Sequence, residues 1–257
     1  MELFFFSQVY FVKRLDTFVG GEMTKISKLI LADSNAVVLP DSIVDLTSLS
    51  DLHITENKLS CLPDCIGKMT SLVSLYVNTN RITHLPDSIG CLSSLTHLFV
   101  NNNQLTYLPD SIGNLLSLRY LYLNGNQLTR LPDSIGKFSS LKSLGVSSNK
   151  LACLPDSIGN LTSLTHLIVC YNQLTQLPDS IVNLTSLVYL DITDNQLTRL
   201  PESIGKLVVD DNKLTRLPDS VRHLPPLGIH VSNNLIKTSC SEIVSKPVMK
   251  EWQCSTS

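Results

Sequence analysis

Apolar residues recur along this chain with a long, regular period. Within each unit a short stretch alternates with a period of two, as Leu98 and Val100 do on either side of Phe99, and this predicts a strand with one buried face. A strand of about three or four residues cannot bury that face alone, so neighbouring units must stack their strands into a parallel sheet. The pattern therefore predicts an array of coils, each contributing one short strand.

Proline marks the second half of each unit. The series consists of Pro40, Pro63, Pro86, Pro109, Pro132, Pro155, Pro178, Pro201 and Pro218, with intervals of 23 residues up to Pro201 and a last interval of 17. Each proline starts a return limb in an extended conformation. The Asp-Ser-Ile-Gly motif that follows predicts one helical or 3₁₀ turn, with Asp or Ser near its start and Gly ending it. One repeat array, rather than two ordinary domains, accounts for the 257 residues.

An asparagine follows the predicted strand of nearly every unit. The series consists of Asn57, Asn80, Asn103, Asn126, Asn149, Asn172, Asn195, Asn212 and Asn234. A side-chain amide at the end of a strand can bond to the N–H and C=O groups of a tight inward bend, which would otherwise be buried without partners. We therefore expect a structural ladder of asparagines, one in each coil.

Together these features define a repeat that resembles a known family. The unit is L-x-x-L-x-[LVI]-x-x-N-x-L-T-x-L-P-D-S-I-G-x-L-x-S, and its clearest copy runs from Leu95 to Ser117. It resembles the 23-residue, Ras-group intracellular class of leucine-rich repeat (LRR) proteins, and it is similar to bacterial and viral LRR effectors. The resemblance implies an α/β, right-handed LRR solenoid. Such a solenoid has a concave parallel β-sheet, here of about ten short strands, and convex extended or 3₁₀ return limbs. It binds protein partners and carries no catalysis of its own.

Two units depart from this repeat. Ser34 stands where the first unit would have its asparagine, so that bend must be held differently or more loosely. About six residues of the outer limb are missing between Pro201 and Asn212, and this predicts a locally flattened convex side. The unit of Asn234 is also irregular and contains Pro225 and Pro226.

The LRR domain is expected to span residues 26–236, with different segments on either side. Residues 1–25 include the apolar stretch from Leu3 to Val12, which is too short to span a bilayer. We interpret this segment as a cap over the first coil. The alternatives are a signal peptide or a poorly ordered segment before a natural start at Met23. Residues 237–257 predict a C-terminal cap, and a detachable partner-binding peptide is the alternative.

Side chains at positions two, four and six before each ladder asparagine should project from the concave sheet. Three successive coils place Tyr76, Phe99 and Tyr122 in the central column, although aromatic residues make up only 6% of the chain. Exposed aromatic side chains are common anchors of protein interfaces. The alternative is that they only favour strands and stack on one another. The predicted partner-binding residues are Tyr76, His97, Phe99, Asn101, Tyr120, Tyr122, Asn124, His166, Ile168, Tyr189, Asp191 and Asp210.

Charge and chemistry narrow the function further. The net charge of −2 offers no basic field for nucleic acid or an acidic membrane. An acidic patch of Asp191, Asp194, Asp210 and Asp211 could bind Lys or Arg of a partner, or could simply be solvated. The concave histidines lie on coils too far apart to share a metal, and no nucleotide-binding or catalytic motif occurs. We expect no enzyme activity and no cofactor.

Cysteine usage bears on the compartment. The seven cysteines fall at unrelated repeat positions, with no zinc-type or CxxC spacing, which favours reduced thiols in a cytoplasm. The sequence therefore predicts a monomeric, cytoplasmic scaffold in signalling or regulation that binds a protein partner, with no integral membrane segment. The alternative is a secreted pathogen effector, or an adaptor that recruits a ligase, acting in a host cytosol.

Overall fold

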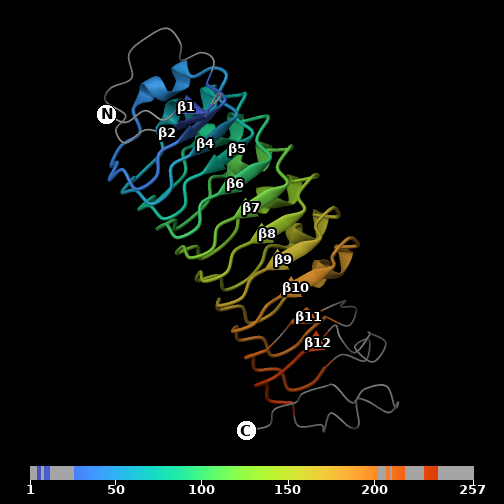
Figure 1. Ribbon diagram of the computed structural model, residues 1–257. Coiled ribbons are helices and arrows are strands. Elements are labelled where there is room, and N and C mark those ends of the chain that lie inside the picture. Colours follow the sequence, from blue (N-terminus) through green and yellow to red (C-terminus); the bar gives the residue numbers. More distant parts are fainter. Residues whose placement is uncertain are drawn as a thin grey trace.

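The computed structural model describes residues 5–6, 9–11, 26–201, 207–208, 210–217 and 229–236. In this part of the chain, 12 strands form one sheet in chain order, and every neighbouring pair is parallel except β1 and β2 (Figure 1). The strands are β1 (Phe5–Phe6), β2 (Val9–Phe11), β3 (Lys28–Ile30), β4 (Asp51–His53), β5 (Ser74–Tyr76), β6 (His97–Phe99), β7 (Tyr120–Tyr122), β8 (Ser143–Gly145), β9 (His166–Ile168), β10 (Tyr189–Asp191), β11 (Leu207–Val208) and β12 (Ile229–His230).

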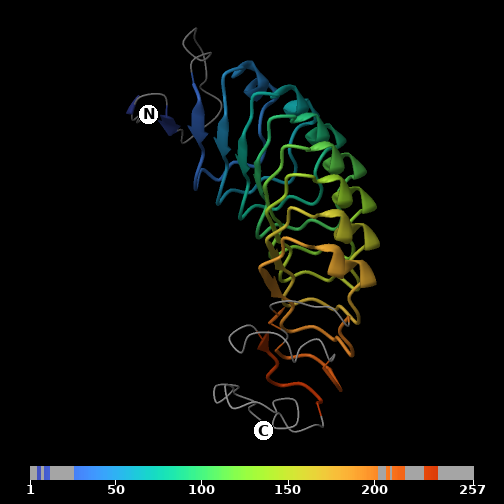
Figure 2. The same cartoon turned by 90° about the vertical axis from the view of Figure 1, so that its right-hand side faces the viewer.

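A short 3₁₀ helix lies on the return limb of each regular coil. These helices are η3 (Asp41–Asp45), η4 (Asp64–Lys68), η5 (Asp87–Cys91), η6 (Asp110–Asn114), η7 (Asp133–Lys137), η8 (Asp156–Asn160) and η9 (Asp179–Asn183). The strands line the inner, concave side of a curved array and the helices its outer side (Figure 2). The expected LRR solenoid is therefore confirmed. The repeats supply ten strands, β3 to β12, and the first 25 residues add β1 and β2.

The core is a continuous stack of leucine and isoleucine between the sheet and the 3₁₀ helices. The middle residue of each strand from β3 to β10, such as Leu98 or Leu121, is fully buried, and the isoleucine of each 3₁₀ helix, such as Ile112, is buried as well. Each coil contributes the same few apolar side chains, so no coil has a core of its own. This explains why the period of the sequence is so regular.

The ladder asparagines hold the bend after each strand. Oδ1 of Asn103 accepts a hydrogen bond from the N–H of Ile82 in the preceding coil (3.0 Å), and its Nδ2 donates to the carbonyl of Val77 (2.9 Å). The same two types of bond, to the coil before, recur from Asn57 to Asn212, all of which are buried. Each ladder asparagine thus satisfies backbone groups of the preceding coil and ties successive coils together.

Ser34 takes part in the first bend in another way. Its hydroxyl donates a hydrogen bond to the carbonyl of Ala32, two residues earlier (3.1 Å). In the next coil, Nδ2 of Asn57 makes the corresponding bond to the carbonyl of Thr55. The backbone N–H of Ser34 donates to Oδ1 of Asn57 (3.0 Å). The first bend is therefore held differently from the others, as the sequence indicated.

The glycines of the 3₁₀ helices have a different role from the one expected. Gly136 is the fourth of five residues in η7 and does not end the helix, and Pro132 precedes the helix with no side-chain capping bond. A Cβ added at Gly136 would lie 2.6 Å from the carbonyl oxygen of Ser157 in the next coil. Glycine is needed here because neighbouring return limbs approach so closely. The prediction that Gly ends the turn is wrong, whereas Asp133 stands at the start of the helix as expected.

The shortened unit keeps its inner half. Asp191 of β10 pairs with Val208 of β11, and Oδ1 of Asn212 accepts from the N–H of Leu197 (3.0 Å). The parallel pairing and the asparagine bond of the bend are therefore kept although the unit is short and β11 has only two residues. The predicted flattening concerns the outer limb between Pro201 and Asn212, of which residues 202–206 lie outside the described residues, as does the proposed cap at 237–257. In the N-terminal segment, β2 pairs with β3 in parallel at the start of the sheet, and its role as a cap stays a prediction.

Candidate functional site

The register of the sheet places the predicted concave residues in straight columns. His53, Tyr76, Phe99, Tyr122 and Gly145 lie directly beside one another on β4 to β8, and the column continues through Ile168 and Asp191 to Val208 and His230. His97, Tyr120, Ser143, His166 and Tyr189 form the second column. The structure thus brings the predicted residues onto one face, and their role in binding stays a prediction.

Four rings of the central column stack into an aromatic ladder, which we define as His53, Tyr76, Phe99 and Tyr122. Their successive ring centroids are 4.2, 4.6 and 5.0 Å apart, with interplanar angles of 25°, 20° and 9°. Since each ring covers the face of the next, all four side chains are half-buried rather than fully exposed. The faces of Tyr76 and Phe99 lie against other rings, so this surface offers a partner mainly ring edges and hydroxyl groups.

The ladder ends on a coil that carries only small side chains. The hydroxyl of Tyr122 lies 2.8 Å from Oγ of Ser143 on β8, and a Cβ added at Gly145 would lie 2.5 Å from Cδ1 of Tyr122. Ser143, Gly145 and Ser147 are all buried although they project to the concave side. The tyrosine therefore leans over β8 and fills the space above it.

A second aromatic contact lies beside the ladder. The rings of His97 and Tyr120 stack at 4.8 Å, and His97 also lies 6.1 Å from Phe99. On the other side of the ladder, the N–H of Asn101 donates to Oδ1 of Asn78 (2.8 Å) and that of Asn124 to Oδ1 of Asn101 (2.9 Å). Asn101 therefore has a structural role besides the predicted one, because its oxygen already supports the next coil.

Burial shifts the titration of the concave histidines. Burial lowers the pKa of His53, and Lys28 lowers it further while Asp51 opposes the shift. Burial also lowers the pKa of His97, with Asp51 opposing and Arg119 reinforcing the shift. Both rings are therefore neutral at pH 7, which suits their stacking within an apolar row.

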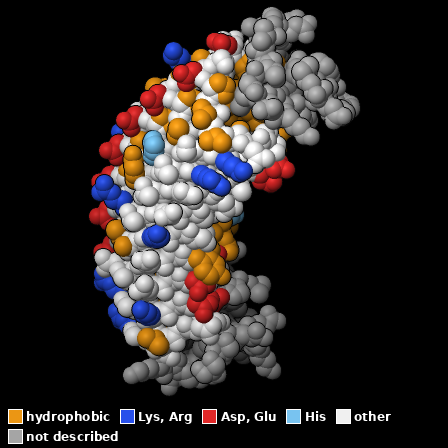
Figure 3. All heavy atoms as spheres, turned by 90° about the vertical axis from the view of Figure 1, so that its left-hand side faces the viewer, with side chains coloured by type: hydrophobic (Ala, Val, Ile, Leu, Met, Phe, Trp, Pro, Cys, Tyr) orange, Lys and Arg blue, Asp and Glu red, His pale blue; other side chains and the backbone are white. Residues whose placement is uncertain are grey.

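Acidic side chains gather near the C-terminal end of the described array, beside hydrophobic side chains (Figure 3). Oδ1 of Asp210 accepts from the N–H of Ser232, and Oδ1 of Asp211 accepts from Nδ2 of Asn233 (2.8 Å). The carboxylate of Asp194 raises the pKa of the phenol of Tyr171, a side chain that is 58% exposed. Each of these aspartates thus has a protein donor close by.

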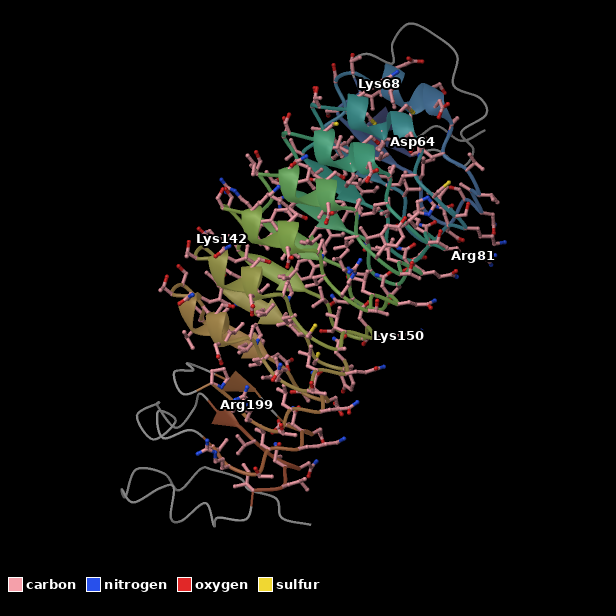
Figure 4. The ribbon with its side chains drawn as sticks, turned by 180° about the vertical axis from the view of Figure 1, so that it is seen from behind. Asp64, Lys68, Arg81, Lys142, Lys150 and Arg199 are labelled. Carbon is pink, nitrogen blue, oxygen red and sulfur yellow. The ribbon has the colours of Figure 1, made fainter. Side chains whose placement is uncertain are left out.

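Basic side chains lie almost entirely away from the concave columns. Figure 4 labels Lys68 on η4, Lys142 just before β8, and Arg81 and Lys150 directly after two ladder asparagines. Of the Lys and Arg residues within the described ranges, only Lys28 stands in a concave column. The acidic residues Asp51, Asp191 and Asp210 also stand in these columns, so the described concave face has an excess of negative charge.

The described concave face carries one cysteine thiol, Cys170, beside its histidines. Burial raises the pKa of the Cys170 thiol, whose Sγ donates to Oγ of Ser147 at 3.0 Å, so the thiol stays protonated at neutral pH. No cluster of three or more His, Cys, Asp or Glu residues that could hold a metal occurs among the described residues. His97 and His166 stand three strands apart, which is about 14 Å, too far to share one metal ion.

Two features of this site are not among the sequence-based predictions. His53 is the first ring of the ladder, and its position one coil before Tyr76 in the same column was the available signal. The cross-coil bonds of the second asparagine row are the other feature, and the repeated spacing of Asn78, Asn101 and Asn124 was the signal for them. The contact between Tyr122 and Gly145 needed the structure, because the direction in which the ring leans cannot be read from spacing.

Comparison with known protein families agrees with this architecture. Models described as "Leucine rich repeat" match residues 24–82 and 70–128, "Leucine-rich repeat region" matches 100–190, and a further "Leucine Rich Repeat" matches 186–207. The chain belongs to the leucine-rich repeat family. No curated protein matches this LRR chain significantly. Within the described residues, the LRR array contains no helix that is long and apolar enough to cross a bilayer.

Several solved LRR structures are similar. A Leptospira interrogans LRR protein has 31% sequence identity and a TM-score of 0.78, over 86% of this chain and 64% of that one. The plant peptide hormone receptor RGFR1, solved in complex with RGF2, has 31% identity and a TM-score of 0.72, over 80% and 36%. YopM, a leucine-rich effector protein from Yersinia pestis, has 28% identity and a TM-score of 0.67, over 82% and 56%. The present LRR chain thus spans less than two thirds of each of these proteins.

Proposed function

We propose that this LRR protein is a non-enzymatic scaffold that binds a protein partner on its concave face. The family and fold are typical of protein-interaction modules. The observation that carries the proposal is the aromatic ladder, which occupies concave positions that have no duty in the leucine core. Partly exposed aromatic rings at the centre of a face are typical anchors of protein interfaces. The solved complex of RGFR1 with RGF2 supports a protein-binding role for the family.

The wider setting that we propose is regulation or signalling by a monomer in the cytoplasm. The odd number of cysteines and their scattered positions support a reducing compartment. Mass measurement of the purified chain by light scattering tests the monomer, and counting free thiols in the denatured, non-reduced protein tests the compartment. Seven free thiols and a mass near 28.4 kDa are expected. Fewer thiols would argue for disulfides and secretion.

The second candidate function is a secreted effector or a ligase-recruiting adaptor in a host cytosol. The similarity to the YopM effector favours this candidate. Such an effector would bind its partner on the same concave face as the cytoplasmic scaffold, so the two candidates differ in where the protein acts rather than in how it binds. Expression of the tagged protein in its own source cells would separate the two. Retention in the producing cell supports the first candidate, and export supports the second.

Partner recovery with concave variants tests the binding face. The triple variant Y76A/F99A/Y122A removes three rings of the ladder, and Tyr189→Ala removes a 37% exposed ring outside it. The matched control is Tyr107→Ala, since Tyr107 is 50% exposed but lies after the bend, away from the concave columns. Both concave variants should lose partner recovery while the control retains it. Equal recovery by all three, with folding verified by circular dichroism, would contradict the proposal.

A further inference from the structure

Two concave histidines share the same hydrogen-bonded arrangement. Oγ1 of Thr96 lies 3.1 Å from the carbonyl oxygen of Val73 and 2.7 Å from Nδ1 of His97. Oγ1 of Thr165 lies 2.8 Å from the carbonyl oxygen of Lys142 and 2.9 Å from Nδ1 of His166. In each case the carbonyl belongs to the preceding coil, so the stacking of coils creates the arrangement.

The arrangement determines which ring nitrogen carries the proton. A carbonyl oxygen can only accept, so the single hydrogen of the threonine hydroxyl goes to the carbonyl. The hydroxyl oxygen must then accept from Nδ1–H of the histidine. The neutral form of each imidazole is therefore the Nδ1–H tautomer, in which the Nε2 atom is an acceptor.

The two Nε2 atoms are available to a partner. Neither has a hydrogen-bond partner in the described part of the chain, and His97 is half-buried while His166 is exposed. Both residues stand in the same concave column, separated by the strands of Tyr120 and Ser143. Three strand spacings make about 14 Å, which an extended polypeptide covers with about four residues.

Charge on the same face indicates what kind of segment would fit. Beyond His166, the columns continue through Tyr189 to the carboxylates of Asp191 and Asp210, which are half-buried. Among the described residues, no Lys or Arg stands in these columns between His97 and Asp210. This half of the face thus presents hydrogen-bond acceptors, two of them charged, and attracts a segment rich in donors and positive charge.

We propose that the concave face binds an extended basic segment of a protein partner that runs along the axis of the array. Donors about four residues apart bond to Nε2 of His97 and of His166, and Lys or Arg side chains meet Asp191 and Asp210. This inference rests on the proposed function and specifies the partner of the same face. Protonation of His97 turns its Nε2 into a donor and adds positive charge beside Asp51 and Arg119, so binding weakens in acid.

A random dodecapeptide display library, selected on the whole chain at pH 7.5, tests the proposal. The enriched peptides should carry hydrogen-bond donors about four residues apart, and Lys or Arg beyond one end of that pair. His97→Phe and His166→Phe keep an aromatic ring but lose Nε2, and each should weaken binding of a selected peptide about three- to tenfold, the worth of one hydrogen bond. His84→Gln is the matched control, since His84 is exposed and lies outside the concave columns.

The outcomes separate this inference from the proposed function. Selected peptides that lack basic residues, or that bind the two phenylalanine variants as tightly as the wild type, overturn the inference. If those same peptides lose binding to Y76A/F99A/Y122A, the concave face still binds and only the partner chemistry was wrong. Failure to enrich any peptide dependent on the concave face overturns both. The tautomers are tested directly by long-range ¹H–¹⁵N correlation of the histidine side chains, and a proton on Nε2 of His97 or His166 at pH 7.5 would also overturn the inference.

Discussion

The ring of Tyr122 occupies the space that a side chain at residue 145 would need. Its Cδ1 atom lies 2.5 Å from the position of a Cβ on Gly145, and its hydroxyl lies 2.8 Å from Oγ of Ser143. The position of Tyr122 on β7 therefore requires a glycine at residue 145 of β8, and the serine at residue 143 gives its hydroxyl a hydrogen-bond partner. The aromatic ladder ends here because the next coil makes room for its last ring.

Substitution of Gly145 should displace this ring. Gly145→Ala is expected to destabilise the protein by about 1–3 kcal/mol, because the ring is held by Phe99 on one side and Ser143 on the other. The measurement is urea unfolding followed by circular dichroism. In the background of Tyr122→Ala, the same substitution should cost much less. Equal losses in the two backgrounds would show that the ring does not constrain residue 145.

The close approach of return limbs should make Gly136 intolerant of a side chain. Gly136→Ala places a Cβ against the backbone carbonyl of Ser157, which cannot move aside without moving the coil. A loss of about 2 kcal/mol or more in unfolding free energy is expected. Ser157→Ala is the matched control, since its buried hydroxyl has no partner among the described residues, and it should change stability by less than about 0.5 kcal/mol. Similar effects of the two changes would refute this account.

The ladder asparagines should be costly to remove. Asn103→Ala leaves the buried N–H of Ile82 without its partner, and the carbonyl of Val77 keeps only the longer bond from Nδ2 of Asn80 (3.2 Å). A loss of about 1–3 kcal/mol is expected. The neighbouring exposed residue Gln104 offers the control, and Gln104→Ala should be nearly neutral. Hydrogen exchange should locate the damage, with faster exchange at Ile82 in the Asn103 variant. Unchanged protection at Ile82 would contradict the bonding described above.

Stability should fall as the solution is acidified through the range of histidine titration. The ordinary pKa of histidine is 6.5, and the folded protein lowers the pKa of both His53 and His97, chiefly by burial. The unfolded chain therefore binds more protons below pH 6.5. The stabilisation is complete above that pH and is lost as the pH falls through the lowered values.

Unfolding in urea between pH 7.5 and pH 5 measures this dependence. The double variant H53F/H97F keeps aromatic rings in both places but cannot titrate there, so its stability should change less over this range. A wild type and a double variant with the same slope would show that these two histidines do not cause the loss.

Much of the site was predictable because, in a regular repeat, the number of residues between a side chain and its ladder asparagine gives its position in the sheet. The position of Tyr76, Phe99 and Tyr122 in one column follows from their distance to Asn80, Asn103 and Asn126, and the structure places them so. Counting residues gave a wrong prediction where the distance between neighbouring coils, rather than the strand register, determines the residue type. It assigned Gly136 to ending a turn, whereas the backbone of Ser157 in the next coil is what requires it.

The amino-acid sequence by itself determined the leucine core, the parallel sheet and the buried asparagine ladder, since each depends only on which residue types recur at which spacing. Tertiary structure alone decided how side chains of adjacent coils meet. It stacks the rings of the ladder, leans Tyr122 over Gly145, and places the carbonyl of Val73 against the hydroxyl of Thr96. The reason is physical: spacing gives the coil and the face of a residue, but contacts depend on the distance and direction between coils, which only the packed array sets.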